Sequence, residues 1–342
     1  MWQTVGHDAA VLALARAIGQ GRMHHALLVV GPPRVGKMAL AMDVARALNC
    51  IGDEPPCGAC RQCARISASL HPDVRVIGLG EDAQGRAKTL ISIEQVRELQ
   101  KEASLKPYEG AFRVFIIDGV DRLSDEGANS LLKTLEEPPD QVVLALLASD
   151  ASAVLTTIHS RCRRLELRPV SVDAIADHLA QALGVESELA QEVARLSSGR
   201  IGWAIQAAQE PALLERLADR LDVIERTVLS GLEPRFEYAA QLAGRFAQSR
   251  ADVLDELGLW LGWWRDVMVV CEGKPELVSH SSRRPSLETV ASGLDAAQSA
   301  VAVRAVERVV GLLERNVNPR LAVEELMLAM PHPQSPDGVA QP

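Results

Sequence analysis

Apolar residues in the first half of the chain fall into short runs that are separated by segments with helical spacing. Four of these runs predict buried β-strands, at residues 27–30, 112–117, 142–148 and 164–167. Between them, residues 37–49 place apolar side chains on one helical face, and a second helix is predicted after Ser124. Strands that alternate with helices are typical of a parallel sheet covered on both faces, so an α/β fold is predicted for residues 1–168.

The strand pattern disappears after Pro169, and helical spacing replaces it. Residues 169–210 contain three short helical segments, which predict a small helical domain. From Pro211 onward every strongly periodic segment is helical, so residues 211–331 are predicted to form an all-α domain. Residues 332–342 contain proline and polar side chains without periodicity and are predicted to be a disordered tail.

Three tryptophans stand out in the predicted all-α domain. Trp260, Trp263 and Trp264 occupy positions i, i+3 and i+4, which lie on one face of a helix. Large apolar side chains grouped in this way favour packing in a core, and a contact with another subunit is the alternative.

The composition is that of a globular protein with an acidic balance. The chain has 342 residues, which favours two or three domains, and a formal net charge of −9. Proteins that bind DNA by themselves neutralise phosphates with basic groups, so this charge argues against a free-standing DNA-binding protein. No long apolar run and no signal-peptide pattern is found, so no membrane association and a cytoplasmic location are expected.

A degenerate phosphate-binding loop is found at residues 31–38, GPPRVGKM, between a predicted strand and a predicted helix. In a P-loop of the form G-x-x-x-x-G-K-[ST], the backbone wraps the phosphates, the lysine reaches the outer phosphates and the hydroxyl binds Mg²⁺. Gly31, Gly36 and Lys37 keep the cradle, but Met38 offers a thioether, which is a poor ligand for a hard cation. A plain glycine-containing turn is the alternative.

The second element of a nucleotide site, an apolar strand that ends in Asp-Glu, is also incomplete. The strand here ends in Asp118 and Gly119, so glycine replaces the acid that would polarise an attacking water. We therefore predict that ATP or ADP binds weakly or not at all, and that this chain does not hydrolyse ATP.

Four of the six cysteines lie close together in the sequence, at Cys50, Cys57, Cys60 and Cys63. Four thiolates are the ligand set of a structural, tetrahedral Zn²⁺ site, so a zinc-bearing insertion is predicted at residues 50–63. An iron–sulfur cluster is the alternative, because short cysteine spacings also occur in cluster motifs.

These motifs combine with others in the first 210 residues into a pattern that resembles a known family. The others are His24-His25-Ala26-Leu27 before the P-loop, the segment NSLLKTLEEPP at residues 129–139, and Ser160-Arg161-Cys162. Together they are similar to bacterial clamp-loader subunits of the AAA+ family, which belong to the DNA polymerase III holoenzyme. The resemblance implies a AAA+ P-loop domain, a helical lid at 169–210, and a collar at 211–331 that joins subunits into an oligomer.

The family contains ATP-hydrolysing motor subunits and a non-hydrolysing subunit, and this chain resembles the latter. Motor subunits keep a hydroxyl residue after the lysine and Glu after the second-element Asp, whereas this chain has Met38 and Gly119. Motors also carry an arginine that senses the γ-phosphate, and the aligned position here is Gly202, or Arg200 if the alignment shifts. An active gamma/tau-type motor and a non-replicative, zinc-stabilised P-loop kinase or scaffold are the alternatives.

The segment Ser160-Arg161-Cys162 resembles the arginine finger of the family, which points at the nucleotide of a neighbouring subunit. The resemblance implies that Arg161 acts in trans on ATP bound elsewhere. By sequence position alone, Arg161 is instead an ordinary exposed arginine. The implied partners are the gamma/tau and delta subunits, the sliding clamp, and primed DNA within the assembly.

Overall fold

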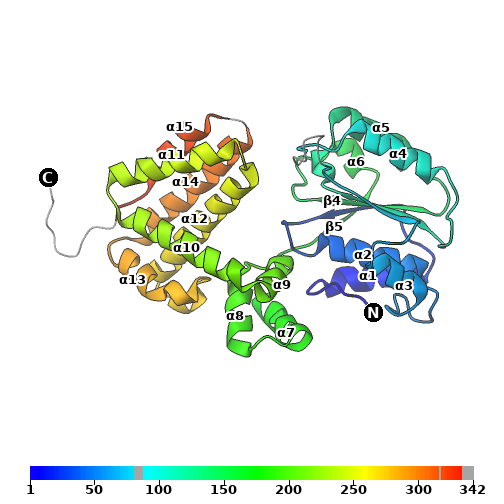
Figure 1. The fold of residues 1–342 in the computed structure, drawn as a ribbon, viewed down its shortest axis with the longest axis horizontal. Helices are drawn as coiled ribbons and strands as arrows, with labels where there is room; N and C mark the ends of the chain where they lie inside the picture. Colours follow the sequence, from blue (N-terminus) through cyan, green and yellow to red (C-terminus); the bar gives the residue numbers. More distant parts are fainter. Residues whose placement is uncertain (81–87, 316, 333–342) are drawn as a thin grey trace. The chain divides into compact units, whose positions relative to one another are not determined.

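The computed structural model describes residues 1–80, 88–315 and 317–332 (Figure 1). It divides into two compact units, residues 1–206 and residues 207 onward. The first unit contains an α/β sheet domain and the second is all-α, so the predicted fold class is confirmed. The predicted tail lies outside the described residues except for His332.

The first unit is built on a five-stranded parallel sheet in the order β2-β3-β4-β1-β5. Its strands are β1 (Ala26–Val30), β2 (Val74–Ile77), β3 (Arg113–Asp118), β4 (Val142–Ala148) and β5 (Arg163–Glu166). The three inner strands are almost fully buried, which explains their continuous apolar runs. The sequence pattern does not predict β2, because this edge strand buries only Ile77.

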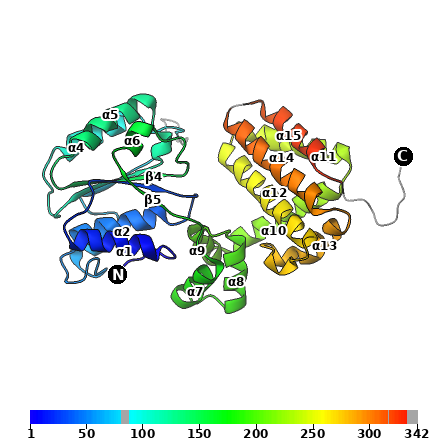
Figure 2. The ribbon, with the colours of Figure 1, turned by 180° about the vertical axis from the view of Figure 1, so that it is seen from behind.

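Helices cover both faces of this sheet, as Figures 1 and 2 show. One face carries α1 (Asp8–Gly19), α2 (Lys37–Asn49) and α3 (Arg61–Ser67), and the other carries α4 (Ile93–Ala103), α5 (Asp125–Glu136) and α6 (Thr156–His159). Successive side chains of β1 alternate between the two hydrophobic clusters, with Leu27 in the cluster on the α2 side and Leu28 in the cluster on the α5 side. Because β1 is buried on both faces, packing fixes the position of its carboxyl end, where the P-loop begins.

Helix α5 begins at the predicted cap and ends near the predicted stop. The Ser124 Oγ accepts a hydrogen bond from the Gly127 N–H at 3.1 Å, which satisfies one of the free donors of the first turn. Leu131 and Leu135 are buried against the sheet, while Leu132 is only half-buried. The helix ends at Glu136, ahead of two consecutive prolines.

Three short helices follow the sheet, as the sequence predicts, at α7 (Val172–Leu183), α8 (Ser187–Leu196) and α9 (Ile201–Gln209). The start of α9 lies directly on the P-loop. The Gly202 N–H donates to the Arg34 carbonyl oxygen at 2.8 Å, and the Arg34 Nη1 donates to Gln206 Oε1 at 2.6 Å. The small helical unit is thus bonded to the loop that would hold phosphate.

The second unit contains six α-helices within its described residues, namely α10 (Pro211–Leu229), α11 (Leu232–Phe246), α12 (Arg250–Cys271), α13 (Arg284–Ser292), α14 (Ala296–Glu314) and α15 (Pro319–Ala329). Short 3₁₀ turns η2 (Pro275–Leu277) and η3 (Ser281–Arg283) precede α13, and a further one, η1 (Val120–Arg122), follows β3 in the first unit. None of the helices in the described part of the chain combines the length and apolarity needed to cross a membrane.

The tryptophans of α12 form part of the core of this unit. Trp260, Trp263 and Trp264 are fully buried, and the Trp260 Nε1–H donates to the Tyr238 hydroxyl at 2.8 Å. The prediction of core packing is confirmed. Because none of the three side chains is exposed, they do not form a surface for another subunit.

Arg235 of α11 ties three parts of the all-α unit together. Its buried guanidinium donates to the carbonyl oxygens of Val228 at 2.7 Å and Met330 at 3.1 Å, and burial lowers its pKa. Replacement by methionine keeps the apolar stem but leaves these carbonyls without a donor. We expect Arg235→Met to lower the free energy of unfolding by about 3 kcal/mol.

Denaturant unfolding followed by tryptophan fluorescence measures this effect, because Trp260, Trp263 and Trp264 lie in the same unit. Arg226→Met is the matched control, since Arg226 is exposed and donates to the carbonyl oxygen of Asp222 in its own helix. Equal unfolding curves for the two variants would contradict a structural role for Arg235.

Candidate functional site

The P-loop joins β1 to α2 and has the backbone of a phosphate cradle. Gly36 caps α2 with a φ of 113°, a region that favours glycine. A Cβ added at Gly31 would lie 2.4 Å from the Leu167 carbonyl oxygen, which is too close for any side chain. Both glycines predicted as cofactor-binding residues are therefore required by the local backbone.

The ammonium group of Lys37 is bonded to its own loop. Lys37 is buried, and its Nζ donates to the carbonyl oxygens of Gly31 at 2.5 Å and Pro32 at 2.9 Å. Burial lowers the pKa of Lys37, and the negative charges of Asp118 and Asp121 oppose that shift. The two aspartates therefore lie near enough to the lysine to act on its charge.

The position that follows the lysine is used for packing. Met38 is half-buried and packs against the hydrophobic cluster formed by α1, α2 and one face of the sheet. A flexible thioether fills irregular apolar gaps well and is a poor ligand for Mg²⁺. The residue that would bind the metal in a working P-loop is replaced here by a methionine that packs against the core.

The end of β3 also departs from a hydrolytic site. Asp118 is exposed at the strand end, and Gly119 follows with a φ of 95°. An L-amino acid rarely adopts this conformation, so a glutamate at position 119 would strain the backbone. Asp121, the next carboxylate along the chain, accepts hydrogen bonds from the backbone N–H groups of Ser149 at 3.0 Å and Asp150 at 3.1 Å.

The start of α9 leaves little room for a side chain at Gly202. A Cβ at this position would lie 3.1 Å from the Arg34 carbonyl oxygen. Arg200, the alternative sensor position, donates from its Nε to the Ser197 carbonyl oxygen at 2.9 Å. The close approach at Gly202 gives a physical reason for glycine there, while the role of Arg200 stays a prediction.

The four clustered cysteines converge in space. Cys50 caps the end of α2, Cys60 precedes α3, and Cys63 lies buried within α3. All four sulfur atoms lie within 4.8 Å of one another, and the Cys50 and Cys60 sulfurs are 4.0 Å apart. Zn–S bonds of about 2.3 Å in a tetrahedron place sulfurs about 3.8 Å apart, so the set fits a Zn²⁺ ion.

Backbone donors support thiolates at this cluster. The N–H groups of Cys57, Cys60 and Cys63 donate to the sulfurs of Cys50, Cys57 and Cys60 respectively, at 3.3 to 3.4 Å. Burial acts to raise the pKa of Cys60, but hydrogen bonds from the backbone and from the side chains of Cys57 and Cys63 together outweigh it and lower that pKa to about 6. Burial raises the pKa of Cys63 to about 12, so metal uptake would displace a proton there.

The side chain of Arg161 lies just after α6 and is fixed by three acceptors. Its Nη1 donates to the Thr157 carbonyl oxygen at 2.9 Å and to Ser160 Oγ at 3.1 Å, and its Nη2 donates to Glu136 Oε1 at 2.5 Å. Burial raises the pKa of the adjacent Cys162 thiol to about 12, which suits a packing residue and not a nucleophile. Sequence reasoning missed Glu136, because 25 residues separate the pair.

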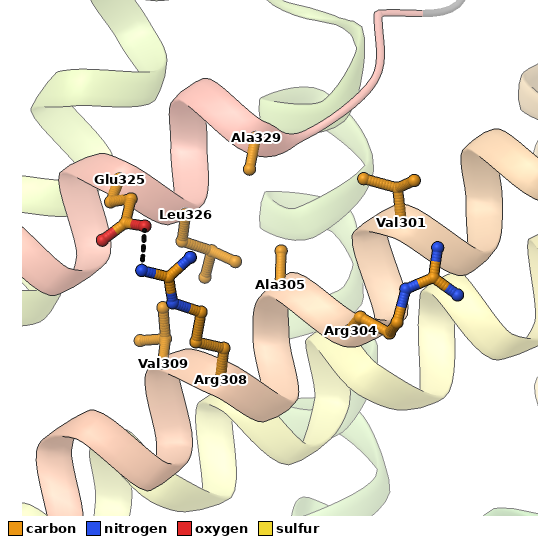
Figure 3. Close-up of a pocket in the computed structure, with 8 residues that line it drawn as sticks. All are labelled: Val301, Arg304, Ala305, Arg308, Val309, Glu325, Leu326 and Ala329. Atoms are coloured by element: carbon orange, nitrogen blue, oxygen red, sulfur yellow. Dashed lines mark ion pairs between the residues drawn. The ribbon is translucent and has the colours of Figure 1, made fainter.

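A hollow of about 230 Å³ lies between α14 and α15 in the all-α unit. Its floor is apolar, and Arg304 and Arg308 lie on opposite sides of it, as Figure 3 shows. Arg308 forms an ion pair with Glu325 at 3.1 Å. Sequence reasoning did not identify this hollow, because its lining comes from two helices whose mutual register only the folded chain reveals.

Comparisons with known proteins show that most of the first unit is similar to a known family. A family described as "DNA polymerase III, delta subunit" matches residues 6–171. The Haemophilus influenzae DNA polymerase III subunit tau/gamma is 38% identical over 185 residues, or 54% of this chain and 26% of that protein. The Escherichia coli subunit tau is 35% identical over 214 residues, covering 60% of this chain and 32% of its own length.

The matched segment is a part of these proteins, since this chain spans between about a quarter and a half of the length of the curated relatives. Among solved structures, a gamma-subunit-related protein of Thermotoga maritima has a TM-score of 0.44 at 14% identity over 93% of this chain and 97% of its own. A Bacillus subtilis clamp loader delta protein has a TM-score of 0.33 at 13% identity over 94% and 99%. Both scores are low, so the fold rests on the sheet order and helix arrangement described above. Residues 6–171, together with the sequence motifs, are therefore similar to the clamp-loader subunits of DNA polymerase III.

Proposed function

We propose that this chain is the delta-prime-type subunit of a DNA polymerase III clamp loader, which does not hydrolyse ATP itself. In this role it supplies Arg161 to the ATP held by a neighbouring gamma/tau-type subunit. With a delta subunit it would help the assembly open a sliding clamp and place it on primed DNA. Its net charge of −9 suits a subunit that holds DNA only together with partners.

The observation that carries the proposal is the packing of Met38, next to Lys37, against the core cluster. ATP hydrolysis at a P-loop depends on a metal that bridges the outer phosphates. Because the Met38 side chain has no oxygen atom, the P-loop lacks one of the ligands that would bind that metal. The φ of 95° at Gly119 supports the same conclusion, because the backbone disfavours the second acid.

An active motor is the second candidate, and the curated relatives favour it. Those relatives are named gamma and tau subunits, and they are 30 to 38% identical over 54% of this chain. The shared segment includes the P-loop domain, so the two candidates have the same fold. Only the ability to bind and split ATP separates them.

Titration of the isolated chain with Mg-ATP tests the proposal directly. We expect no heat of binding, or a dissociation constant in the millimolar range, together with no measurable ATP turnover. The calorimetric curve and the release of phosphate are measured on the same preparation. Turnover that disappears in the Lys37→Ala variant would establish an active motor, whereas turnover that persists in that variant comes from a contaminant.

The zinc-bearing cluster and the all-α unit have structural roles in the proposal. A closed set of four thiolates leaves no position for substrate, so a bound Zn²⁺ would fasten the loop between α2 and α3. The lid domain at 169–210 and the collar at 211–331 would hold the P-loop domain within the oligomer. The single boundary between the two compact units, between residues 206 and 207, supports the proposed division between lid and collar.

A further inference from the structure

The contacts of Arg161 point to a second residue with a role in its action. We infer that Glu136 is a positioning residue, which holds the guanidinium of Arg161 in the orientation that the neighbouring ATP requires. The inference rests on the proposed function of Arg161. It adds a residue of this chain that touches neither nucleotide nor metal and acts only through the arginine.

The three hydrogen bonds fix the plane of the guanidinium but do not exhaust its donors. A guanidinium has five N–H groups in a rigid fork. The bonds to Glu136, Thr157 and Ser160 use three of them, so two remain for the oxygens of a phosphate. An arginine that is oriented before the neighbour arrives loses less rotational freedom when it binds.

Glu136 reaches Arg161 because two helices end at the same place. Glu136 is the last residue of α5, and Arg161 follows the short helix α6 by two residues. The carboxyl end of a helix carries partial negative charge, which adds to the attraction of Glu136 for the guanidinium. The folded chain therefore places a carboxylate from a different helix next to Arg161.

The exposure of the pair allows it to act at a subunit boundary. The side chain of Arg161 is 33% exposed and that of Glu136 is 51% exposed. An ion pair with this exposure is weak, because water screens both charges. Glu136 can thus orient the arginine without preventing it from contacting a triphosphate, whose charge is larger than that of one carboxylate.

The alternative is a carboxylate that restrains the arginine and must release it. The two roles predict opposite changes in the rate of ATP hydrolysis when Glu136 is removed. If Glu136 positions Arg161, its removal slows hydrolysis by the neighbour. If Glu136 competes with the phosphate, its removal speeds hydrolysis.

The test uses the reconstituted clamp loader, with the P-loop lysines of the other motor copies inactivated so that turnover reports the interface with Arg161. We expect Glu136→Ala to lower kcat about five-fold, the rate equivalent of losing an exposed ion pair, with KM for ATP unchanged. Glu136→Gln keeps an acceptor oxygen and is expected to recover part of the loss. Glu137→Ala is the matched control, since Glu137 is an exposed neighbour on the same chain segment.

A double-mutant cycle separates positioning from a general structural effect. In the Arg161→Ala background, Glu136→Ala is expected to cause no further loss, because its only route to the nucleotide has been removed. An additive loss, an unchanged kcat or a faster enzyme overturns the inference. If Arg161→Ala itself leaves turnover unchanged, the proposed function fails together with the inference; if only Glu136→Ala is silent, the finger stands and the positioning role does not.

Discussion

Arg161→Ala is expected to abolish nearly all ATP turnover at the one interface that this residue faces, while the clamp loader still assembles. A guanidinium at the γ-phosphate stabilises the charge that develops during phosphoryl transfer and is worth about 10³- to 10⁵-fold in rate. The side chain is partly exposed, and among the described residues outside its own loop it bonds to one side chain, Glu136, so its loss should not disturb the fold. DNA-stimulated ATP turnover and co-purification of the subunits are the two measurements.

The control for this variant is Arg164→Ala. Arg164 is exposed on the edge strand β5 three residues further along, and its ion pair with Glu166 is long at 3.6 Å. It tests whether any loss of positive charge on this surface slows hydrolysis. Equal turnover in the Arg161→Ala and wild-type assemblies would refute the arginine finger, and loss of assembly would show that Arg161 is an interface residue instead.

Loss of zinc from the proposed site at the cysteine cluster is the second change for which we expect a large effect. Structural zinc in small sites contributes on the order of 10 kcal/mol, which is comparable to the ~5–15 kcal/mol that opposes unfolding of a whole domain. Cys60→Ser removes one ligand at the start of α3. We expect it to release zinc and to lower the melting temperature clearly, with the loss confined to the first unit.

Elemental analysis and thermal denaturation with and without a chelator measure the two parts of this prediction. Cys162→Ala is the control within the same unit, because its thiol packs on the core and lies outside the cluster. It should retain zinc and melt with only a small shift. A protein that contains no zinc and melts unchanged after Cys60→Ser would disprove the metal site, and iron with visible absorption would favour the iron–sulfur alternative.

Most of the secondary structure follows from local pattern, and the exceptions have physical reasons. The inner strands β1, β3 and β4 are buried on both faces, so each is a continuous apolar run in the sequence. Strand β2 lies at the sheet edge, and the polar residue Arg75 interrupts its apolar residues. Its apolar pattern in the sequence is therefore weak. Both ends of helix α5 can be predicted from the sequence, because the cap at Ser124 and the prolines that follow the helix act locally.

In the candidate site, too, some features follow from the sequence and others appear only in the folded chain. Lys37, Asp118 and the four cysteines belong to short sequence motifs, so they could be predicted without a structure. The relation of Arg161 to Glu136 could not, although Glu136 lies inside the motif at residues 129–139. Two residues on different helices become neighbours only through the packing of those helices.

By itself, the sequence determined which side chains occupy the candidate site. A thioether follows Lys37, glycine follows Asp118, and four thiols occur within one short segment, and these facts depend on residue identity alone. The tertiary structure decided that Met38 packs against the core, that Gly119 has a left-handed backbone and that Glu136 forms an ion pair with Arg161. Those outcomes depend on which distant segments the folded sheet and helices bring together, and local periodicity carries no information about that.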